Sequence, residues 1–133
     1  MRAYLDAFYS IEGGYLSKVV SQHSENTPEA LWLLFDKRSL LIQVNPDDDT
    51  IRVTAGDVME AAGAEYVDLS STAFWRDFTG QQFGWGWIVT NQQGYCDGAM
   101  LSFGGISPQV LLEVVASSLK MHRVGEAETI TDQ

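Results

Sequence analysis

The chain has 133 residues, the usual size of a single domain and enough to bury an independent hydrophobic core. Its composition is ordinary for a globular protein, but its formal net charge of −10 argues against binding to nucleic acid or to anionic membrane surfaces. The same charge permits electrostatic capture of a basic protein partner.

The cysteine count and the N-terminal sequence indicate the cellular compartment in which the protein is expected. The one cysteine, Cys96, excludes an internal disulfide framework and is typical of a reducing environment. The first residues lack the long apolar run of a signal peptide, and no apolar stretch is long enough to span a membrane. We therefore expect a cytoplasmic protein with one domain over residues 1–124 and a polar tail over 125–133.

The first half of the chain predicts a short helix or irregular arm over residues 1–12, a strand over 15–21, and three strands within 31–54. With residues 36–39 as the first turn, Phe35 lies opposite Leu40, and with 46–49 as the second, Val44 lies opposite Ile51. This register places one apolar face against the core: Leu31, Leu33, Phe35, Leu40, Ile42, Val44, Ile51 and Val53.

The opposite face of these three strands is part apolar and part polar. It carries Trp32, Leu34, Leu41, Gln43, Thr50, Arg52 and Thr54. A fully solvated face would hold more charge. We therefore expect either the chain's own helix or another molecule to cover it.

The middle of the chain predicts a helix over 57–64, a short strand over 65–69, and a hairpin of strands 85–90 and 95–103 around the turn 91–94. Pairing Thr90 with Tyr95 makes both faces of this hairpin apolar, which is typical of interior strands. Trp85 and Trp87 are then expected in the core, whereas Trp32 and Trp75 are candidate anchors for a partner.

The C-terminal part predicts a helix that starts with Ser107 as N-cap and Pro108 in its first position. Its apolar stripe is Val110, Leu111, Val114, Val115 and Leu119. The predicted fold class is therefore α+β: an antiparallel sheet of about five to seven strands with a C-terminal helix packed on one face.

The sequence contains no recognisable catalytic or metal-binding motif, so we expect no metal and no cofactor. The consecutive acids at 47–49 lack the spacing of a calcium loop and indicate a solvated turn. His23 and His122 belong to no zinc spacing, and Cys96 is expected to be a buried, inert thiol. No glycine-rich phosphate loop is present.

Asp97 is the acid with the most distinctive surroundings, because the predicted hairpin places it among apolar side chains. A buried carboxylate usually finds a hydrogen-bond donor. One interpretation is a structural pair with backbone N–H groups or with Arg52 or Arg76. The alternative is a general acid in a cleft near Tyr95 and Trp87.

Three stretches resemble a known family: residues 84–87 (GWGW), 91–98 (NQQGYCDG) and 44–53 (VNPDDDTIRV). They are similar to a small family of bacterial proteins known only as a domain of unknown function, and the likeness covers most of residues 1–122. It implies a cytoplasmic bacterial protein of one domain and brings no catalytic residue. In size, acidity and layout the chain also resembles immunity proteins that block polymorphic toxins, an analogy of general character.

These observations favour a non-enzymatic binding protein, such as an immunity protein or adaptor, that uses acidic and aromatic surface against a basic protein partner. The alternatives are a small-molecule binder or weak enzyme with a pocket near Asp97, Tyr95 and Trp87, and a homodimer formed through the second face of the 31–54 strands. The candidate binding residues are Trp32, Gln43, Arg52, Trp75, Tyr95 and Asp97.

Overall fold

The computed structural model describes residues 2–24, 27–57, 65–125 and 128–130. Within them the chain forms one helix, α1 (Arg2–Ser10), and nine strands. The strands are β1 (Leu16–Ser24), β2 (Thr27–Phe35), β3 (Arg38–Asn45), β4 (Thr50–Asp57), β5 (Tyr66–Asp68), β6 (Phe83–Thr90), β7 (Cys96–Phe103), β8 (Val110–Val115) and β9 (Ser118–Arg123).

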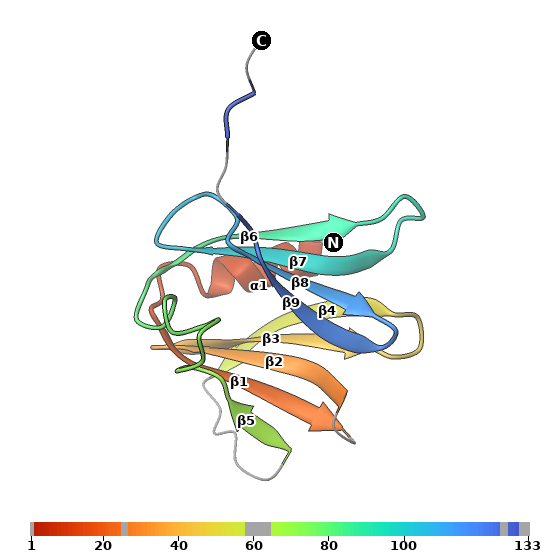
Figure 1. Cartoon of the computed structure of the whole chain (residues 1–133), viewed down its shortest axis with the longest axis horizontal. Helices are drawn as coiled ribbons and strands as arrows, with labels where there is room; N and C mark the ends of the chain where they lie inside the picture. The colour runs from red at the N-terminus through yellow and green to blue at the C-terminus, as the bar shows by residue number, and fades with distance from the viewer. Residues whose placement is uncertain (1, 25–26, 58–64, 126–127, 131–133) are drawn as a thin grey trace.

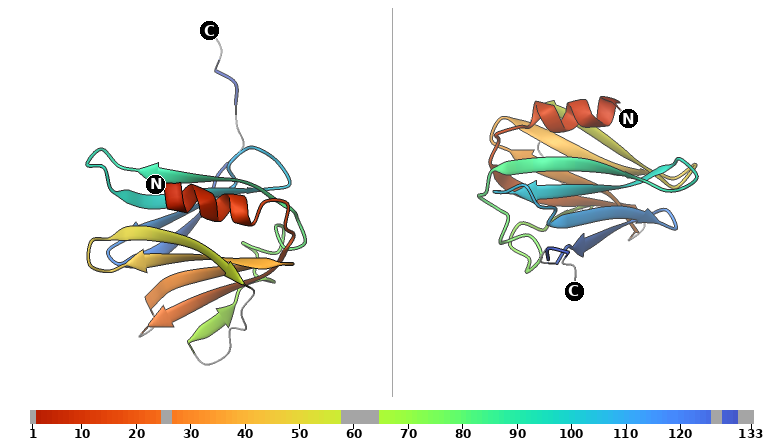
Figure 2. Two further views of the ribbon diagram at one scale, coloured as in Figure 1. Left: turned by 180° about the vertical axis from the view of Figure 1, so that it is seen from behind. Right: turned by 90° about the horizontal axis from the view of Figure 1, so that it is seen from above.

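The strands form two antiparallel sheets that pack face to face (Figure 1). One sheet has five strands in the order β4-β3-β2-β1-β5, and the other has four in the order β6-β7-β8-β9. Helix α1 lies across the open side of this sandwich, beside the edge strands β4 and β6 (Figure 2). No helix in the described ranges is long and apolar enough to cross a membrane.

The core fills the space between the sheets, and its five-stranded half is the face that alternation predicts. All eight residues of that predicted face are buried. From the other sheet come the alternate side chains of β7 and β8, among them Leu101, Phe103 and Leu112. Each sheet thus presents every second side chain to the other, as in other β-sandwiches.

The predicted register of β2 and β3 is wrong by two residues, although the faces are right. Leu33 pairs with Leu40 and Leu31 with Ile42, so the turn between the strands is shorter than expected. A shift of two residues leaves every side chain on its original face, and the hydrophobic pattern cannot detect it. Between β3 and β4 the predicted pairing of Val44 with Ile51 is confirmed.

The predicted C-terminal helix is wrong, and with it the α+β fold class. Residues 110–123 form the hairpin β8–β9, whose turn places Ala116 and Ser117 at positive φ of 50° and 63°. Two consecutive left-handed residues are the geometry of a tight hairpin turn. Val110, Leu112 and Val114 point to the core with period two, and β-branched valine suits a strand better than a helix.

The β6–β7 hairpin also differs from its predicted form. A register shift after Val89 pairs Thr90 with Cys96 in place of Tyr95, and β6 is an edge strand and not an interior one. The strands predicted at 15–21 and 65–69 correspond to β1 and β5. The helix predicted at 57–64 falls outside the described residues after Asp57, which ends β4.

Strand β5 continues into an acid-capped turn at the edge of the five-stranded sheet. Asp68 accepts a hydrogen bond from the backbone N–H of Ser70 at 2.9 Å, and Lys18 Nζ lies 3.9 Å from its carboxylate. Hydrogen bonds from the side chain and backbone of Ser70, aided by Lys18, lower the pKa of Asp68 from its usual 3.8.

We expect Asp68 to contribute to the acid sensitivity of folding. Because its pKa is lower in the folded chain, its contribution is complete above the unfolded value and is lost as pH falls below about 4. An NMR titration of the side-chain carboxyl should give a midpoint below 3.8, and Ser70→Ala should raise it. In Asp68→Asn, the free energy of unfolding measured in urea should decrease less between neutral and acidic pH than it does in the unsubstituted protein. An unchanged pH dependence would refute this role.

Candidate functional site

The two tryptophans of β6 lie on the molecular surface, contrary to the core position predicted for them. The Trp85 side chain is 57% exposed, and Trp87 is half-buried. Their ring centroids are 6.2 Å apart at an interplanar angle of 39°. They stand on the outer face of the four-stranded sheet, where Trp87 pairs across the strands with Met100.

Helix α1 is held against β6 at a glycine. A Cβ atom on Gly86 would come within 2.5 Å of the Phe8 ring, so only glycine allows the helix to approach this closely. The Phe8 ring in turn stacks on Phe83 with a centroid distance of 6.2 Å. This packing brings the exposed side of α1 next to Trp85.

A pocket of about 230 Å³ lies between α1 and β6. We call it the aromatic pocket. Tyr9 is 71% exposed at its rim, and Glu12 is the only charged residue among the described residues that line it. The lining residues are Leu5, Phe8, Tyr9, Glu12, Phe83, Gly84, Trp85 and Gly86.

The chemistry of the aromatic pocket suits a cationic side chain. The faces of Trp and Tyr rings attract ammonium and guanidinium groups, and an arginine or lysine stem can pack on apolar walls. The carboxylate of Glu12 would complement the charge of such a group. Among the described residues of the lining, no nucleophile is hydrogen-bonded to a base, the arrangement typical of covalent catalysis.

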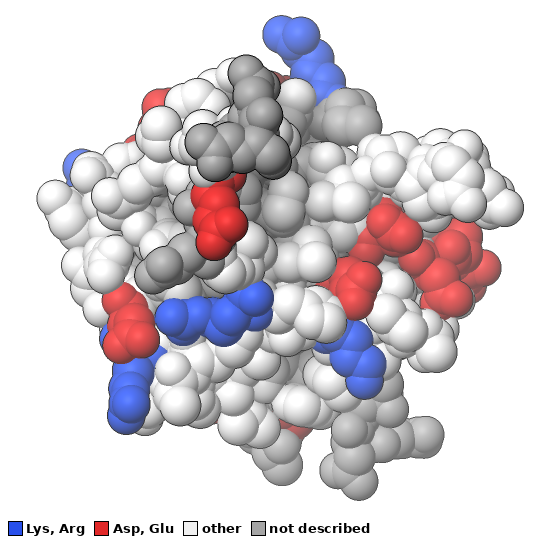
Figure 3. Space-filling model, turned by 45° about the horizontal axis from the view of Figure 1, so that its top comes forward, with Lys and Arg blue, Asp and Glu red and all other residues white. Residues whose placement is uncertain are grey.

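Acidic side chains gather beside the large uncharged surface seen in Figure 3, on its right-hand side. On the outer face of the four-stranded sheet, Glu113 contacts His122 with 2.7 Å between Oε1 and Nε2. Asp49, in the β3–β4 turn, accepts a hydrogen bond from the Ser117 hydroxyl at 2.8 Å, which ties the two hairpin turns together. Both acids therefore already have a partner within the chain, and neither lines the aromatic pocket.

Three predicted binding residues lie together on the outer face of the five-stranded sheet. Gln43 and Arg52 pair across β3 and β4, and Trp32 stands on β2 with its Nε1 donating to Gln22 Oε1 at 3.3 Å. Leu34 on the same face is 7% exposed. This group is separate from the aromatic pocket, whose lining includes none of these residues.

Trp75, which the sequence singled out as a possible partner anchor, lies entirely inside the core at 0% exposure. Its ring packs against Phe74, Phe78 and Phe103, and its Nε1 donates to Met121 Sδ at 3.2 Å. It therefore offers no surface to a partner. Trp75 is thus in the core and Trp85 on the surface, the reverse of the positions that the sequence predicted.

Tyr95 and Asp97 lie at the tip of the β6–β7 hairpin. Tyr95 is 50% exposed, and Asp97 accepts a hydrogen bond from Asn91 Nδ2 at 3.3 Å. The donor to Asp97 is thus a side-chain amide in the turn, in place of the expected backbone N–H groups, Arg52 or Arg76. None of the three pockets described for this structure is lined by Tyr95, Asp97 or Trp87.

Among the residues placed by the structure, no group of three or more His, Cys, Asp or Glu side chains could hold a metal ion. Cys96 is half-buried, packs against the edge of the core, and lies 3.6 Å from the Thr90 hydroxyl. His23 Nε2 lies 2.8 Å from the Ser21 hydroxyl on β1 of the five-stranded sheet, whereas His122 is on β9 of the four-stranded sheet. The aromatic pocket was missed in the sequence because it joins residues 5–12 to 83–86 only through tertiary packing.

Comparison with known proteins places the chain in a family. No curated protein and no solved structure matches it. A family model described as "Family of unknown function (DUF6334)" matches residues 1–128. This range includes the helix, all nine strands and every residue of the aromatic pocket. The chain therefore belongs to the DUF6334 family, which confirms the suspected likeness to an uncharacterised domain family.

Proposed function

We propose that this protein is a non-enzymatic binding protein that captures a basic protein partner through the aromatic pocket and the exposed tryptophans of β6. The observation that supports this most directly is that Trp85, 57% exposed, and Tyr9, 71% exposed, both line a pocket with a single carboxylate among its described lining residues. Tryptophan and tyrosine are the side chains that most often dominate binding at protein interfaces.

The charge of the whole chain supports a basic partner. Eighteen Asp and Glu residues outnumber eight Lys and Arg residues, so a cationic protein would be attracted before contact and steered toward the surface. An immunity protein or adaptor is the kind of protein that would use such a surface, with the partner's arginine or lysine in the pocket beside Glu12. Residues 5–12 and 83–86 then carry the function.

A titration with a hexa-arginine peptide tests the pocket without knowledge of the natural partner. We expect amide resonances in α1 and β6 to shift, and Trp85→Ala to weaken binding about tenfold or more, since buried aromatic anchors contribute at least ~1.4 kcal/mol. Glu12→Gln should weaken binding by a smaller factor of about three, because the charge pair lies at the solvent-exposed rim. The measurement is NMR titration at fixed ionic strength.

Matched controls separate this pocket from general attraction to an acidic protein. Tyr95→Ala removes an aromatic ring of similar exposure outside the pocket, and Asp6→Asn removes an exposed helix carboxylate that does not line it. Both should bind the peptide like the unsubstituted protein. Equal losses in Trp85→Ala and Tyr95→Ala, or shifts spread over all acidic residues, would refute the proposal.

A further inference from the structure

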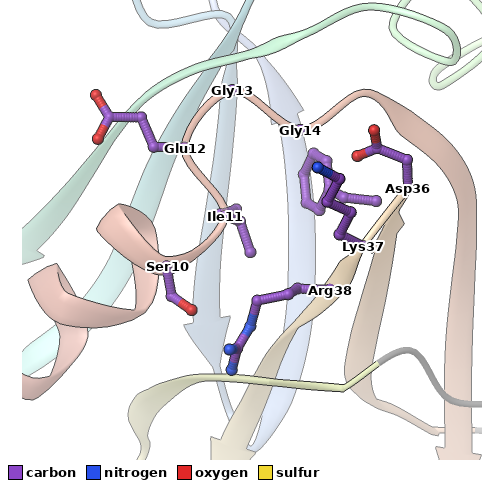
Figure 4. Close-up of a pocket in the computed structure, with 9 residues that line it drawn as sticks. Ser10, Ile11, Glu12, Gly13, Gly14, Asp36, Lys37 and Arg38 are labelled. Carbon is purple, nitrogen blue, oxygen red and sulfur yellow. The ribbon is translucent and has the colours of Figure 1, made fainter.

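The outer face of the four-stranded sheet is uncovered. Seen from above, it is turned towards the viewer, and no helix or strand of the described residues lies over it (Figure 2). A second cavity, of about 220 Å³ beside the β2–β3 turn, has a different character, because the acids Glu12 and Asp36 and the bases Lys37 and Arg38 share its lining (Figure 4). Those charges favour neither an anion nor a cation, whereas the sheet face is mainly apolar.

Two rows of residues run across all four strands of this sheet. The first row is Trp87, Met100, Leu111 and His122, and the second is Val89, Gly98, Glu113 and Lys120. Trp87, Val89, Met100 and Leu111 are each partly exposed, and Val115, which follows Glu113 by two residues on β8, is 45% exposed. We call these two rows and Val115 the apolar face. Contiguous apolar surface of this kind on a soluble protein usually marks an interaction site.

The apolar face carries no net charge, although the whole chain carries −10. Glu113 and Lys120 are direct partners across β8 and β9, so their charges cancel, and Glu113 Oε1 also lies 2.7 Å from Nε2 of His122. A basic partner would gain no electrostatic attraction at such a surface. Two copies of an acidic chain, which repel each other where acids meet, avoid this repulsion when their neutral faces meet.

The size of the apolar face is sufficient for a weak, specific interface. Four strands spaced about 4.8 Å apart and roughly 25 Å long present a flat area of roughly 500 Å². Two such faces in contact would bury about 1,000 Å² or more, which is the lower bound for a specific interface between proteins. A pair of these faces therefore meets the area requirement, but only just.

We propose that two copies of this chain form a dimer through the apolar face, with sheet packed against sheet about a twofold axis. In a twofold arrangement, Glu113 of each copy can face Lys120 of the other, so the charges in the second row are complementary to themselves. The apolar side chains would interdigitate between sheets about 10 Å apart, as they do inside a β-sandwich. Such a dimer is closed and adds no further copies.

This dimer is independent of the proposed function. Met100, Leu111 and Val115 do not line the aromatic pocket. Trp87 is at the border of the apolar face, beside Trp85 of the pocket. The pocket opens between α1 and β6, so a second copy on β7 and β8 leaves it available.

Sedimentation velocity of the unsubstituted protein tests the dimer. Over concentrations from about 1 µM to about 1 mM we expect a monomer–dimer equilibrium with a dissociation constant on the order of 10 µM, the weak binding that a small interface allows. Over the same dilution series, amide resonances in β6–β9 should shift and those in β2–β4 should not. A monomer at every concentration would overturn the proposal.

Matched variants then locate the interface. Leu111→Lys should weaken the dimer at least tenfold, because it places an uncompensated charge at the centre of the apolar face. Leu41→Lys makes the same charge change at a half-buried leucine on the outer face of the five-stranded sheet and should leave the dimer unchanged. Both changes lower the net negative charge, so general repulsion between molecules cannot explain a loss of dimer. Val115→Lys, at a residue already 45% exposed, should also weaken the dimer and replaces Leu111→Lys if that variant does not fold.

The outcomes also separate the dimer from the proposed function. A dimer that persists in Leu111→Lys and Val115→Lys, or that is lost in Leu41→Lys, would refute the apolar face as the interface. Failure of the hexa-arginine peptide to bind would refute the proposed function and leave the dimer intact. A monomeric Leu111→Lys that still binds the peptide is the result expected if both proposals hold.

Discussion

Replacement of Trp75 by alanine is expected to lower the free energy of unfolding by about 3–5 kcal/mol, the range for truncation of a large buried aromatic residue. The side chain is fully buried and touches three phenylalanine rings, and its indole N–H donates to Met121 Sδ. The cavity left behind cannot collapse easily, because both sheets are fixed by their own hydrogen bonds. Urea unfolding followed by circular dichroism measures the change.

Trp85→Ala is the matched control, because it removes the same indole from a site that is 57% exposed. Its effect on unfolding should be below about 1 kcal/mol, as for most surface substitutions. A comparable loss of stability in the two variants would mean that Trp85 belongs to the core. It would then be unavailable to a partner.

Gly84→Ala is expected to destabilise the fold by about 3 kcal/mol or more, at the upper end of the range for overpacking. A Cβ atom there would collide with the backbone carbonyl oxygen of Gly105 and lie 2.5 Å from the Ser102 hydroxyl. Ser102 is wholly buried, accepts the N–H of Trp85 at 2.7 Å and donates to Gly105 O at 2.8 Å. The two obstructing oxygen atoms are held together by their own hydrogen bond, so neither can move away easily.

Gly56→Ala provides the comparison within another edge strand. Gly56 has no atom within 4 Å of the position that a Cβ would occupy, so this substitution should be neutral or slightly stabilising. Thermal unfolding of the two variants gives the difference. Similar melting temperatures would show that the β6–β7 region yields to the extra methyl group.

The strands of the five-stranded sheet could be predicted because their local signal is strong. Alternation in residues 31–53 selects one buried face, and each of its eight members is in the core. The register of β2 and β3 could not be fixed in this way, because it depends on a turn of two residues, Asp36 and Lys37. Patterns of hydrophobicity determine faces, whereas turns determine pairings.

The C-terminal hairpin was mispredicted because its sequence satisfies two periods at once. Val110 and Val114 fit both a helical stripe and an alternating strand, and Ser107-Pro108 is a good helix start. The turn is formed by Ala116 and Ser117. Neither is a glycine or an asparagine, the residues whose presence in a sequence usually predicts a left-handed turn. Tertiary packing decides the outcome in such a segment.

The candidate sites were the least predictable part of the molecule. Trp85 is exposed because β6 is an edge strand, and strand order cannot be derived from a single sequence. The aromatic pocket depends on the approach of α1 to β6, whose lining residues 5–12 and 83–86 are distant from each other in sequence. It arises where separate elements meet, so no contiguous motif marks it.

The position of α1 has a consequence for how copies of this protein can associate through their strand edges. Edge strands present unpaired backbone groups that can recruit strands from other chains. The helix lies beside both β4 and β6, and the Tyr4 hydroxyl donates to the Ile51 carbonyl of β4 at 2.9 Å. Residues 2–10 therefore cover one edge of each sheet, β4 and β6, and hinder intermolecular sheet growth there, in addition to the mutual repulsion between acidic molecules.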